Sequence, residues 1–400
     1  MNTYIIDAIR TPIGNFGGTL KDIRTDDLAA IPIRELVSRN KIDPTKINDV
    51  ILGCANQAGE DNRNIARMAL LLAGIPFSVP GETVNRLCAS GMSAIINAHR
   101  AIKSGDGDLF ISGGIENMTR GPWVISKVSK AFGRDAQMHD SSFGWRFINP
   151  KMKEIYGVDG MGTTAENLAE LYDISREDQD KFAFNSQQKA YKAQKSGRFS
   201  EEIIPISIPQ KKKDPILFEH DEFIKGNTSI EILSKLRTAF KKDGGTVTAG
   251  NASGLNDGAA AMLLASENGV TENNLNPIAK IVSSAVIGVE PRIMGIGPVE
   301  ASNLALKKAG LKLNDIDIIE LNEAFSAQAL ACIRSWGIND DDPRINPNGG
   351  AIALGHPLGV SGTRIMQTAA IELHKQNKKY ALVTMCIGVG QGYATIIEKV

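Results

Sequence analysis

The sequence has no apolar run long enough to cross a membrane and no excess of charge of either sign. A membrane-spanning helix needs about 20 consecutive apolar residues. Lysine and arginine number 45 together, as do aspartate and glutamate, so the formal charge is zero. This balance gives no electrostatic reason to expect nucleic acid or an anionic membrane as a partner. The first residues also lack a basic segment followed by an apolar one, so we expect no secretory signal and a cytoplasmic location.

Cysteine is scarce, and its spacing argues against structural uses. No Cys-x-x-Cys pair occurs, and no histidine stands at zinc-finger spacing. We therefore expect neither a disulfide framework nor a metal site, and a reducing compartment fits. Two of the four cysteines stand in apolar runs, which predicts buried core thiols of low reactivity. These two are Cys54 and Cys332, and the others are Cys88 and Cys386.

Glycine is abundant, at 39 residues, which predicts tight crossings or backbone held close to a ligand. A chain of 400 residues is expected to form two or three domains. Segments typical of strands alternate with segments typical of helices, and this predicts a parallel sheet covered on both faces. The expected strands are 4–6, 49–54, 108–112, 261–264, 278–286, 316–321, 381–385 and 393–399, and the expected helices are 28–38, 62–73, one from Cys88, 326–336 and 363–374.

The late part of the chain repeats the early part. Residues 89–95 align with residues 360–366 at an offset of 271, and strand 109–112 falls on 380–383 at the same offset. A near-constant offset across helix and strand signals indicates duplication. We therefore expect two similar α/β halves related by a pseudo-dyad, with a ligand site at their shared boundary.

Residues 118–253 differ in character and read as an insertion that covers a pocket. A long amphipathic helix fills its middle, with Ser175 as the predicted cap, Asp178 at the reciprocal position and Gly197 at the end. The run Lys211–Lys213 is interpreted as a solvated loop, with a phosphate contact as the weaker alternative.

The duplication directs four reactive side chains toward that boundary. Cys88 opens the helix of the first half, where the positive end of the helix dipole favours a thiolate. His356 precedes the matching helix of the second half, and a histidine within reach activates a cysteine nucleophile. Cys386 and Asn322 end strands of the second half, and a second cysteine of near-neutral pKa suits proton transfer. Backbone N–H groups of the glycine-rich loop around Gly388 suit an oxyanion. Together they indicate acyl transfer through a thioester, with a carbanion formed beside it.

Each of these residues also has an ordinary structural explanation. Cys88 and Cys386 suit buried positions, and His356 suits a role in holding its loop. Asn322 suits a cap for the helix that begins at Ser326. The coincidence of four such residues at one pseudo-symmetric boundary favours the chemical interpretation.

The motifs that carry these residues resemble the signatures of the thiolase family, in order and over the full length. They are residues 85–91 (NRLCASG), 249–258 (AGNASGLNDG), 322–325 (NEAF), 355–359 (GHPLG) and 386–392 (CIGVGQG). The resemblance implies a duplicated, five-layered αβαβα fold with an inserted α-rich loop domain. It places the N-terminal half at 1–117 and 254–275, the loop domain at 118–253 and the C-terminal half at 276–400. It also implies a homodimer or homotetramer.

The resemblance also assigns roles. Cys88 takes the acyl group from a 3-oxoacyl-CoA, His356 deprotonates Cys88, and Cys386 protonates the departing acetyl-CoA enolate. Asn322 positions a water that shares one oxyanion site with His356, and the N–H groups of Cys88 and Gly388 form the other. Coenzyme A is a co-substrate, with no permanently bound cofactor. The residues implied to contact CoA or the acyl group are Met161, Lys225, Ala249, Ser253 and Phe325.

Two departures and two further stretches bear on the substrate. Residues 160–162 read Gly-Met-Gly where many acetoacetyl-CoA thiolases have His-Met-Gly, and Val389 stands where a third glycine is common. Residues 53–64 and 144–150 resemble the 3-oxoadipyl-CoA thiolase branch. A dicarboxylic acyl chain needs a cation for its far carboxylate, and Arg146 is the candidate, with a surface or inter-subunit arginine as the alternative.

Other functions remain as alternatives. An acetoacetyl-CoA or broad-range 3-ketoacyl-CoA thiolase shares every motif. A ketoacyl synthase or hydroxymethylglutaryl-type condensing enzyme shares the duplicated fold, but the loop that begins at Cys386 fits the two-cysteine pattern better. A dinucleotide-binding site fails because residues 388–392 lack the full G-x-G-x-x-G spacing and precede a strand. An inactive CoA-binding protein is disfavoured by the intact set of Cys88, His356 and Cys386.

Overall fold

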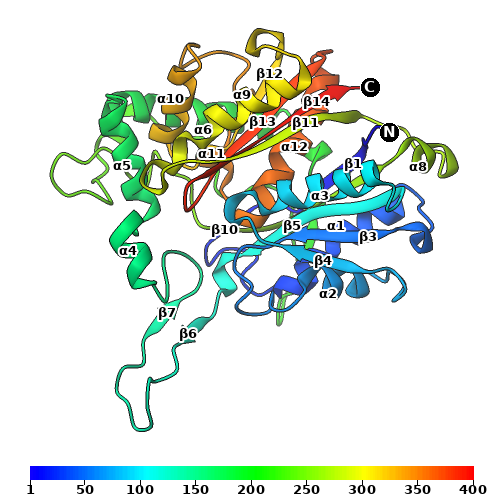
Figure 1. Cartoon of the computed structure of the whole chain (residues 1–400), viewed down its shortest axis with the longest axis horizontal. Helices are drawn as coiled ribbons and strands as arrows, with labels where there is room; N and C mark the ends of the chain where they lie inside the picture. Colours follow the sequence, from blue (N-terminus) through cyan, green and yellow to red (C-terminus); the bar gives the residue numbers. More distant parts are fainter.

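One ten-stranded β-sheet, whose strands divide into a first-half and a second-half part, packs with three layers of helices in the structure, a computed structural model that describes residues 1–400 (Figure 1). The strands follow one hydrogen-bonded path, β12-β13-β14-β11-β1-β10-β5-β3-β4, with β2 paired to β10. The pairing along this path is shortest between β1 and β11, which pair only at Tyr4–Lys280 and Ile5–Ala279. The strands are β1 (Tyr4–Arg10), β2 (Gly14–Asn15), β3 (Asp49–Gly53), β4 (Gly81–Val84), β5 (Leu109–Asn117), β10 (Asn256–Ala265), β11 (Ala279–Gly288), β12 (Ile318–Leu321), β13 (Tyr380–Ile387) and β14 (Gln391–Lys399).

Three apolar cores separate the five layers and confirm the predicted duplicated αβαβα fold. One core joins α1 and α2 to the outer face of the first-half sheet, and another joins α9 and α10 to the outer face of the second-half sheet. The third lies around α3 and α12 and receives side chains from both sheets. The helices of the two halves are α1 (Thr25–Arg39), α2 (Ile65–Leu72), α3 (Ser90–Ser104), α8 (Glu267–Glu272), α9 (Gly297–Ala309), α10 (Ser326–Ser335), α11 (Ala351–Leu354) and α12 (Leu358–Lys375).

The prediction of a parallel sheet was wrong, because the sheets are mixed. Only β3–β4, β3–β5 and β12–β13 pair in parallel. A tight turn joins β13 to β14 without a crossover helix, so these strands run antiparallel. Strand β10 enters after the inserted segment and runs antiparallel to both β1 and β5. The residue composition of the strands did not distinguish these antiparallel connections from the βαβ crossovers that join parallel strands.

Repeated glycines bring the central helices α3 and α12 into close contact. A Cβ on Gly91 would lie 2.4 Å from the carbonyl oxygen of Gly359, and one on Gly362 would lie 2.5 Å from the backbone nitrogen of Met92. Both distances are too short for any side chain. The duplicated Ser-Gly pair therefore allows two helix N-termini, and the residues they carry, to meet at one place.

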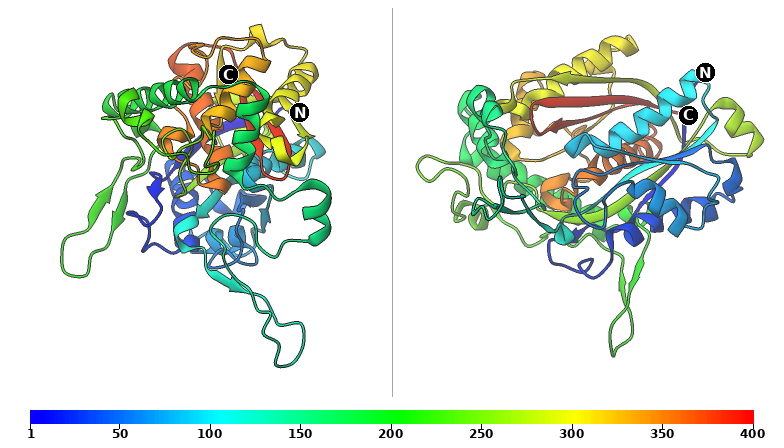
Figure 2. Two further views of the ribbon diagram at one scale, coloured as in Figure 1. Left: turned by 90° about the vertical axis from the view of Figure 1, so that its left-hand side faces the viewer. Right: turned by 60° about the horizontal axis from the view of Figure 1, so that its bottom comes forward.

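Residues 118–253 connect β5 to β10 and pack mainly on the second half. The predicted cap holds, since Ser175 accepts the N–H of Asp178 at 3.0 Å, and Gly197 follows the helix in a left-handed conformation. Two hairpins project from the body (Figure 2). The run Lys211–Lys213 lies exposed between the strands of one hairpin. The segment contains β6 (Trp123–Ile125), β7 (Met138–Asp140), α4 (Pro150–Tyr156), α5 (Met161–Leu171), α6 (Arg176–Lys195), β8 (Ile206–Ile208), β9 (Ile216–Phe218) and α7 (Ile230–Ser234).

Buried ion pairs tie the inserted segment to the first-half sheet. Arg10 of β1 is fully buried and donates to Asp221 at 2.7 and 2.9 Å and to Glu202 at 3.2 Å. Arg198 pairs with the same Glu202 and with Glu372 of α12. Removing one partner would leave a buried charge without compensation, so these pairs fix the position of the inserted segment against β1 and α12. The domain boundaries at 118 and 253 remain a prediction.

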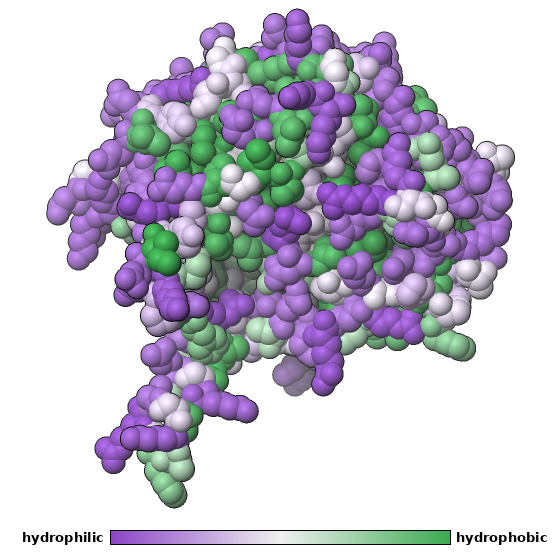
Figure 3. Space-filling view, viewed as in Figure 1, coloured by the Kyte–Doolittle hydropathy of each residue, from purple (hydrophilic) through white to green (hydrophobic).

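Hydrophilic and hydrophobic residues are interspersed on the face of the molecule shown in Figure 3. The hairpin β6–β7 carries exposed apolar side chains, including Trp123, Phe132 and Met138. No helix combines the length and the apolar character needed to span a bilayer.

Candidate active site

Cys88 lies in a short 3₁₀ turn, Leu87–Ala89, that leads directly into α3. The hydroxyl of Ser90 donates to the carbonyl oxygen of Leu87 at 2.7 Å and accepts the N–H of Arg86 at 2.8 Å. Leu87 itself is left-handed, with φ 46°. Such a conformation costs a non-glycine residue about 1–2 kcal/mol. The local structure therefore constrains the turn that presents the thiol.

The helix terminus, which favours the thiolate, does not by itself ionise Cys88. Burial raises the pKa of Cys88 to about 11, although the backbone N–H groups of Gly388 and of Cys88 itself favour the charged form. A helix terminus contributes about 0.3–1 kcal/mol, which is less than one unit of pKa. Desolvation outweighs that contribution, so Cys88 is a neutral thiol at neutral pH and needs a base.

His356 lies in the loop before α12 and is oriented through both its backbone and its ring. Gly355 has φ 99°, and a Cβ there would lie 2.4 Å from the side chain of Asn256. The Oδ1 of Asn256 accepts the backbone N–H of His356 at 3.0 Å, and its Nδ2 donates to the carbonyl oxygen of Gly14. Asn256 thereby holds the histidine loop against the first half.

The hydrogen bonds of Ser361 define the tautomer of His356. The hydroxyl of Ser361 lies 2.6 Å from Nδ1 of His356 and 3.0 Å from the carbonyl oxygen of Pro357. Since a carbonyl oxygen only accepts, the single hydroxyl hydrogen is donated to Pro357. The oxygen of Ser361 then accepts from Nδ1–H, which leaves the lone pair of Nε2 as an acceptor that faces Nδ2 of Asn322.

His356 is a neutral base of the kind that Cys88 requires. Burial and then the nearby charge of Arg364 lower the pKa of His356 to about 3. Its Nε2 lies 3.5 Å from Nδ2 of Asn322. Cys88 and His356 are therefore both uncharged at neutral pH.

Cys386 lies near the end of β13 and is buried. Burial, then Cys88 and Cys332, raise its pKa well above the ordinary value, so the predicted near-neutral pKa was wrong. A Cβ on Gly388, two residues after Cys386, would lie 3.3 Å from Cδ1 of Leu87, so the end of β13 packs against the turn that carries Cys88. In the neutral form Cys386 carries a proton that it can donate.

Asn322 ends β12, and its backbone N–H donates to the carbonyl oxygen of Thr384 at 3.0 Å. The alternative that Asn322 caps the next helix was wrong, because Phe325 is the N-cap residue of α10 and no side chain caps it. The Oδ1 of Asn322 is buried without a protein partner. Its amide therefore remains available to the site.

The loop after β13 is fixed against its surroundings. A Cβ on Gly388 would lie 3.6 Å from Sδ of Met161, the first residue of α5. A Cβ on Gly390 would lie 2.2 Å from the carbonyl oxygen of Val289, whose N–H donates back to Gly390 at 2.8 Å. Val389 between them is left-handed, with φ 64°. The N–H of Gly388 is thus held in place beside Cys88.

The residues implied to contact CoA lie on one connected surface. The N–H of Ser253 donates to the carbonyl oxygen of Ala324, next to Phe325. A Cβ on Gly254 would lie 2.7 Å from the ring of Phe223, and Nζ of Lys225 lies 5.0 Å from the centre of that ring. Lys225 and Ala249 are exposed, and Lys225 has no carboxylate partner.

Arg146 does not line the cavity beside Met161. Its Nη1 donates to the carbonyl oxygen of Ser141 at 3.2 Å, and its Nη2 donates to Oδ1 of Asn56 at 3.4 Å. Both terminal nitrogens of this guanidinium are therefore used by neutral acceptors.

The sequence interpretation missed three residues that orient the site: Ser361, Asn256 and Glu116. Glu116 is buried and accepts the N–H groups of Ala55, Asn56 and Gly359 at 2.9–3.0 Å, so it joins the first half to the start of α12. The repeat offered a signal for Ser361, because it aligns with Ser90 at the same offset of 271. Asn256 and Glu116 act through tertiary contacts that no local sequence pattern predicts.

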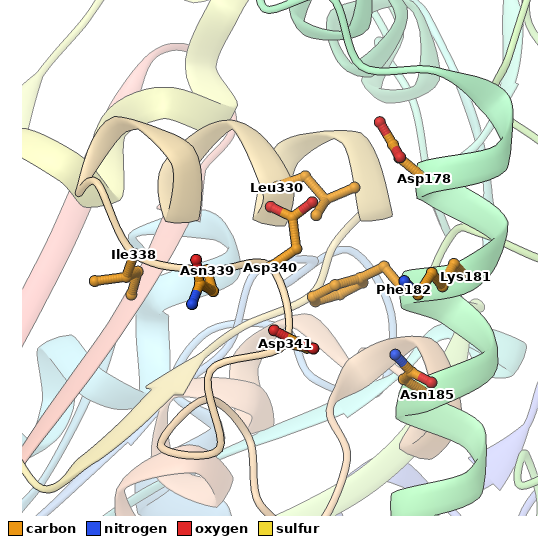
Figure 4. Close-up of a pocket in the computed structure, with 9 residues that line it drawn as sticks. All are labelled: Asp178, Lys181, Phe182, Asn185, Leu330, Ile338, Asn339, Asp340 and Asp341. Atoms are coloured by element: carbon orange, nitrogen blue, oxygen red, sulfur yellow. The ribbon is translucent and has the colours of Figure 1, made fainter.

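A surface pocket of about 360 Å³ lies away from these residues, between α6 and the end of α10 (Figure 4). Its floor is apolar, and its rim carries Asp178, Asp340 and Asp341. Arg334 bridges Asp178 and Asp340 at 2.8 Å each. None of the predicted site residues lines it.

Two cysteines of raised pKa and a neutral histidine at the seam of two duplicated halves are typical of a thiol-dependent acyltransferase. The chain belongs to the thiolase family: the thiolase N-terminal domain matches residues 3–268, and the thiolase C-terminal domain matches residues 275–399.

The similar proteins span the whole chain. It is 58% identical, over 99% of both chains, to the 3-oxoadipyl-CoA/3-oxo-5,6-dehydrosuberyl-CoA thiolase of Escherichia coli K12. It is 56% identical, over 100% of both chains, to a beta-ketoadipyl-CoA thiolase of Acinetobacter baylyi. Among solved structures it resembles the Bacillus anthracis acetyl-CoA acetyltransferase, with 40% identity, a TM-score of 0.92 and coverage of 100% and 99%. Human mitochondrial 3-ketoacyl-CoA thiolase gives 42% identity, the same TM-score and coverage of 100% and 98%.

Proposed function

We propose that the protein cleaves 3-oxoadipyl-CoA with coenzyme A to give succinyl-CoA and acetyl-CoA. The observation that carries this proposal is the identity of 55–58%, over essentially the full length, to proteins named for that substrate. The residues 160–162, Gly-Met-Gly, support it, because they depart from the pattern of many acetoacetyl-CoA thiolases.

The first step is acyl transfer to Cys88. Nε2 of His356 takes the proton of the Cys88 thiol, and Sγ attacks the 3-oxo carbonyl carbon of the substrate. The alkoxide that forms accepts hydrogen bonds from the N–H groups of Cys88 and Gly388. These two N–H groups already favour negative charge on Sγ of Cys88, so they also suit the negative charge that develops on the neighbouring alkoxide oxygen.

The second step breaks the bond between C2 and C3 of the substrate. The electron pair passes to the acetyl-CoA fragment as an enolate, and the carbonyl of the acyl-Cys88 thioester re-forms. His356, now protonated, and a water held by Asn322 stabilise the enolate oxygen. Cys386 supplies the proton to carbon, a role that fits its raised pKa and protonated resting state.

The third step transfers the acyl group to coenzyme A. The thiolate left on Cys386 takes the proton of the incoming CoA thiol, and the CoA sulfur then displaces Cys88, whose thiolate takes its proton back from His356. Ser253 and Phe325 flank the pantetheine arm, and Lys225 and Ala249 lie further out, where Lys225 offers a free cation to a phosphate. Because acetyl-CoA leaves before coenzyme A binds, the kinetics are ping-pong.

The protein is also proposed to act as a homodimer or homotetramer in the cytoplasm. Strand β4 lies at an edge of the sheet, and Leu72 and Phe77 near it are 45% and 84% exposed. An open edge beside exposed apolar residues suits pairing with a second copy. Light scattering of the purified chain tests this, and a monomer at micromolar concentration contradicts it.

A panel of 3-oxoacyl-CoA substrates tests the function. The expected result is the highest kcat/KM with 3-oxoadipyl-CoA. The second candidate, an acetoacetyl-CoA or broad-range thiolase, is favoured by the two solved neighbours, whose names denote such activities. Equal or higher kcat/KM with acetoacetyl-CoA would support that candidate. A CoA-binding protein without activity would cleave none of the substrates.

A further inference from the structure

A small cavity lies directly beyond the catalytic loop. Eight residues line it: Trp145, Tyr156, Gly157, Asp159, Met161, Pro291, Arg292 and Val389. They come from the inserted segment, from the 3₁₀ turn Pro291–Ile296 and from the loop between β13 and β14.

The cavity is connected to Cys88 through a short series of contacts. The N–H of Gly388 bonds to Cys88, and Met161 packs against Gly388. A Cβ on Gly390 would lie 2.9 Å from the backbone nitrogen of Pro291, so the catalytic loop rests on the turn that carries Arg292. The cavity itself measures only about 10 Å³, so an acyl group on Cys88 that extends past Met161 would lie across its mouth, where the side chain of Arg292 is 56% exposed.

Arg292 is the one cationic residue among the eight, and its two terminal nitrogens are free. Its Nε donates to Oδ2 of Asp159 at 3.1 Å, and neither Nη1 nor Nη2 makes a hydrogen bond. Asn167 also donates to that oxygen, at 3.0 Å, which fixes Asp159 and hence the guanidinium. A guanidinium held through Nε presents its end to a second carboxylate in bidentate geometry. In Arg146, by contrast, each terminal nitrogen already donates one hydrogen bond, to Ser141 and to Asn56.

Val389 supplies a second, independent observation. A β-branched residue at φ 64° is an outlier that costs about 1–2 kcal/mol. Strain of this kind persists where the side chain has a use. The side chain of Val389 is 39% exposed and lines the same cavity, between the catalytic loop and Arg292.

We propose that Arg292 binds the far carboxylate of a dicarboxylic acyl chain, and that Val389 and Met161 form the apolar walls for its two methylene groups. This inference rests on the proposed function. It assigns acyl-chain selection to a residue of the second half, in a cavity completed by the inserted segment.

The test compares two substrates of equal chain length, 3-oxoadipyl-CoA and 3-oxohexanoyl-CoA, which differ only in the terminal carboxylate. Arg292→Gln is expected to lower kcat/KM for 3-oxoadipyl-CoA about 10- to 100-fold and to change it less than about 3-fold for 3-oxohexanoyl-CoA. The loss should appear mainly in KM, because the carboxylate is remote from the reacting carbon. Arg292→Lys should restore part of the preference, since it keeps the charge without the bidentate fork.

Arg39→Gln is the matched control. Arg39 lies on the outer helix α1, is exposed, and pairs through Nε with Asp7 of β1. Its preference should equal that of the wild type. An equal loss on both substrates in Arg292→Gln, an unchanged preference, or a selective loss in Arg146→Gln instead would overturn the assignment. A wild type that prefers 3-oxohexanoyl-CoA overturns the proposed function itself, which distinguishes the two failures.

Discussion

Ser361→Ala provides a sharp test of how the base is prepared. The substitution removes the acceptor of Nδ1–H in a site where His356 is only 6% exposed. An unpaired buried donor costs about 1–3 kcal/mol. The cost is greatest when the ring is positively charged, because the hydrogen bond from Nδ1–H then strengthens. We therefore expect kcat/KM to fall about 5- to 150-fold.

Two measurements distinguish this role from a structural one. The single-turnover rate of acyl transfer from 3-oxoadipyl-CoA to Cys88 should fall by a similar factor, because that step needs the base. Ser361→Thr keeps the hydroxyl and should retain most of the activity. A loss below about 3-fold in Ser361→Ala would refute the reasoning. So would equal losses in both variants together with a lowered melting temperature, since that result indicates disturbed packing of α12.

Three further predictions address the thiols and the central packing. Alkylation of Cys88 by iodoacetamide should rise about tenfold per pH unit between pH 6 and 9, because the thiolate reacts and the pKa of about 11 lies above that range; a plateau near pH 7 would indicate a preformed ion pair. Cys386→Ser should retain acylation of Cys88 but lose exchange of the α-protons of acetyl-CoA, measured by NMR in D₂O; undiminished exchange would exclude Cys386 as the carbon acid. Gly91→Ala should lower the free energy of unfolding by about 1–3 kcal/mol in urea, whereas Gly160→Ala, with no atom within 4 Å of the added Cβ, should not; equal stability of the two variants would contradict the packing argument.

The sequence predicted the parts of the fold that depend on local patterns. Helix and strand periodicity, the Ser175 cap and the constant offset between 89–95 and 360–366 all describe features that persist in the structure. The direction of β10 and β14 was not predictable in this way. Composition marks a strand as buried, but it does not say which neighbour the strand joins.

In the candidate site, too, local motifs predicted some features, whereas others depend on tertiary packing. The motifs predicted Cys88, His356 and Cys386 at one seam, but they overstated how readily the two thiols ionise. Both thiols were expected to ionise readily, and burial reverses that expectation. Burial is set by the packing of both halves, so no single motif encodes it. The hydrogen bonds of Ser361 and the free guanidinium of Arg292 likewise exist only in the folded chain.

The central claim is that Cys88 carries the acyl group of a dicarboxylic substrate. The most direct test mixes the protein with 3-oxoadipyl-CoA in the absence of free coenzyme A and locates the adduct by mass spectrometry of peptides. The account predicts a succinyl group on Cys88 that disappears when coenzyme A is added, and no adduct in Cys88→Ala. An acetyl group on Cys88, a succinyl group on another cysteine, or an adduct that persists in Cys88→Ala would contradict it.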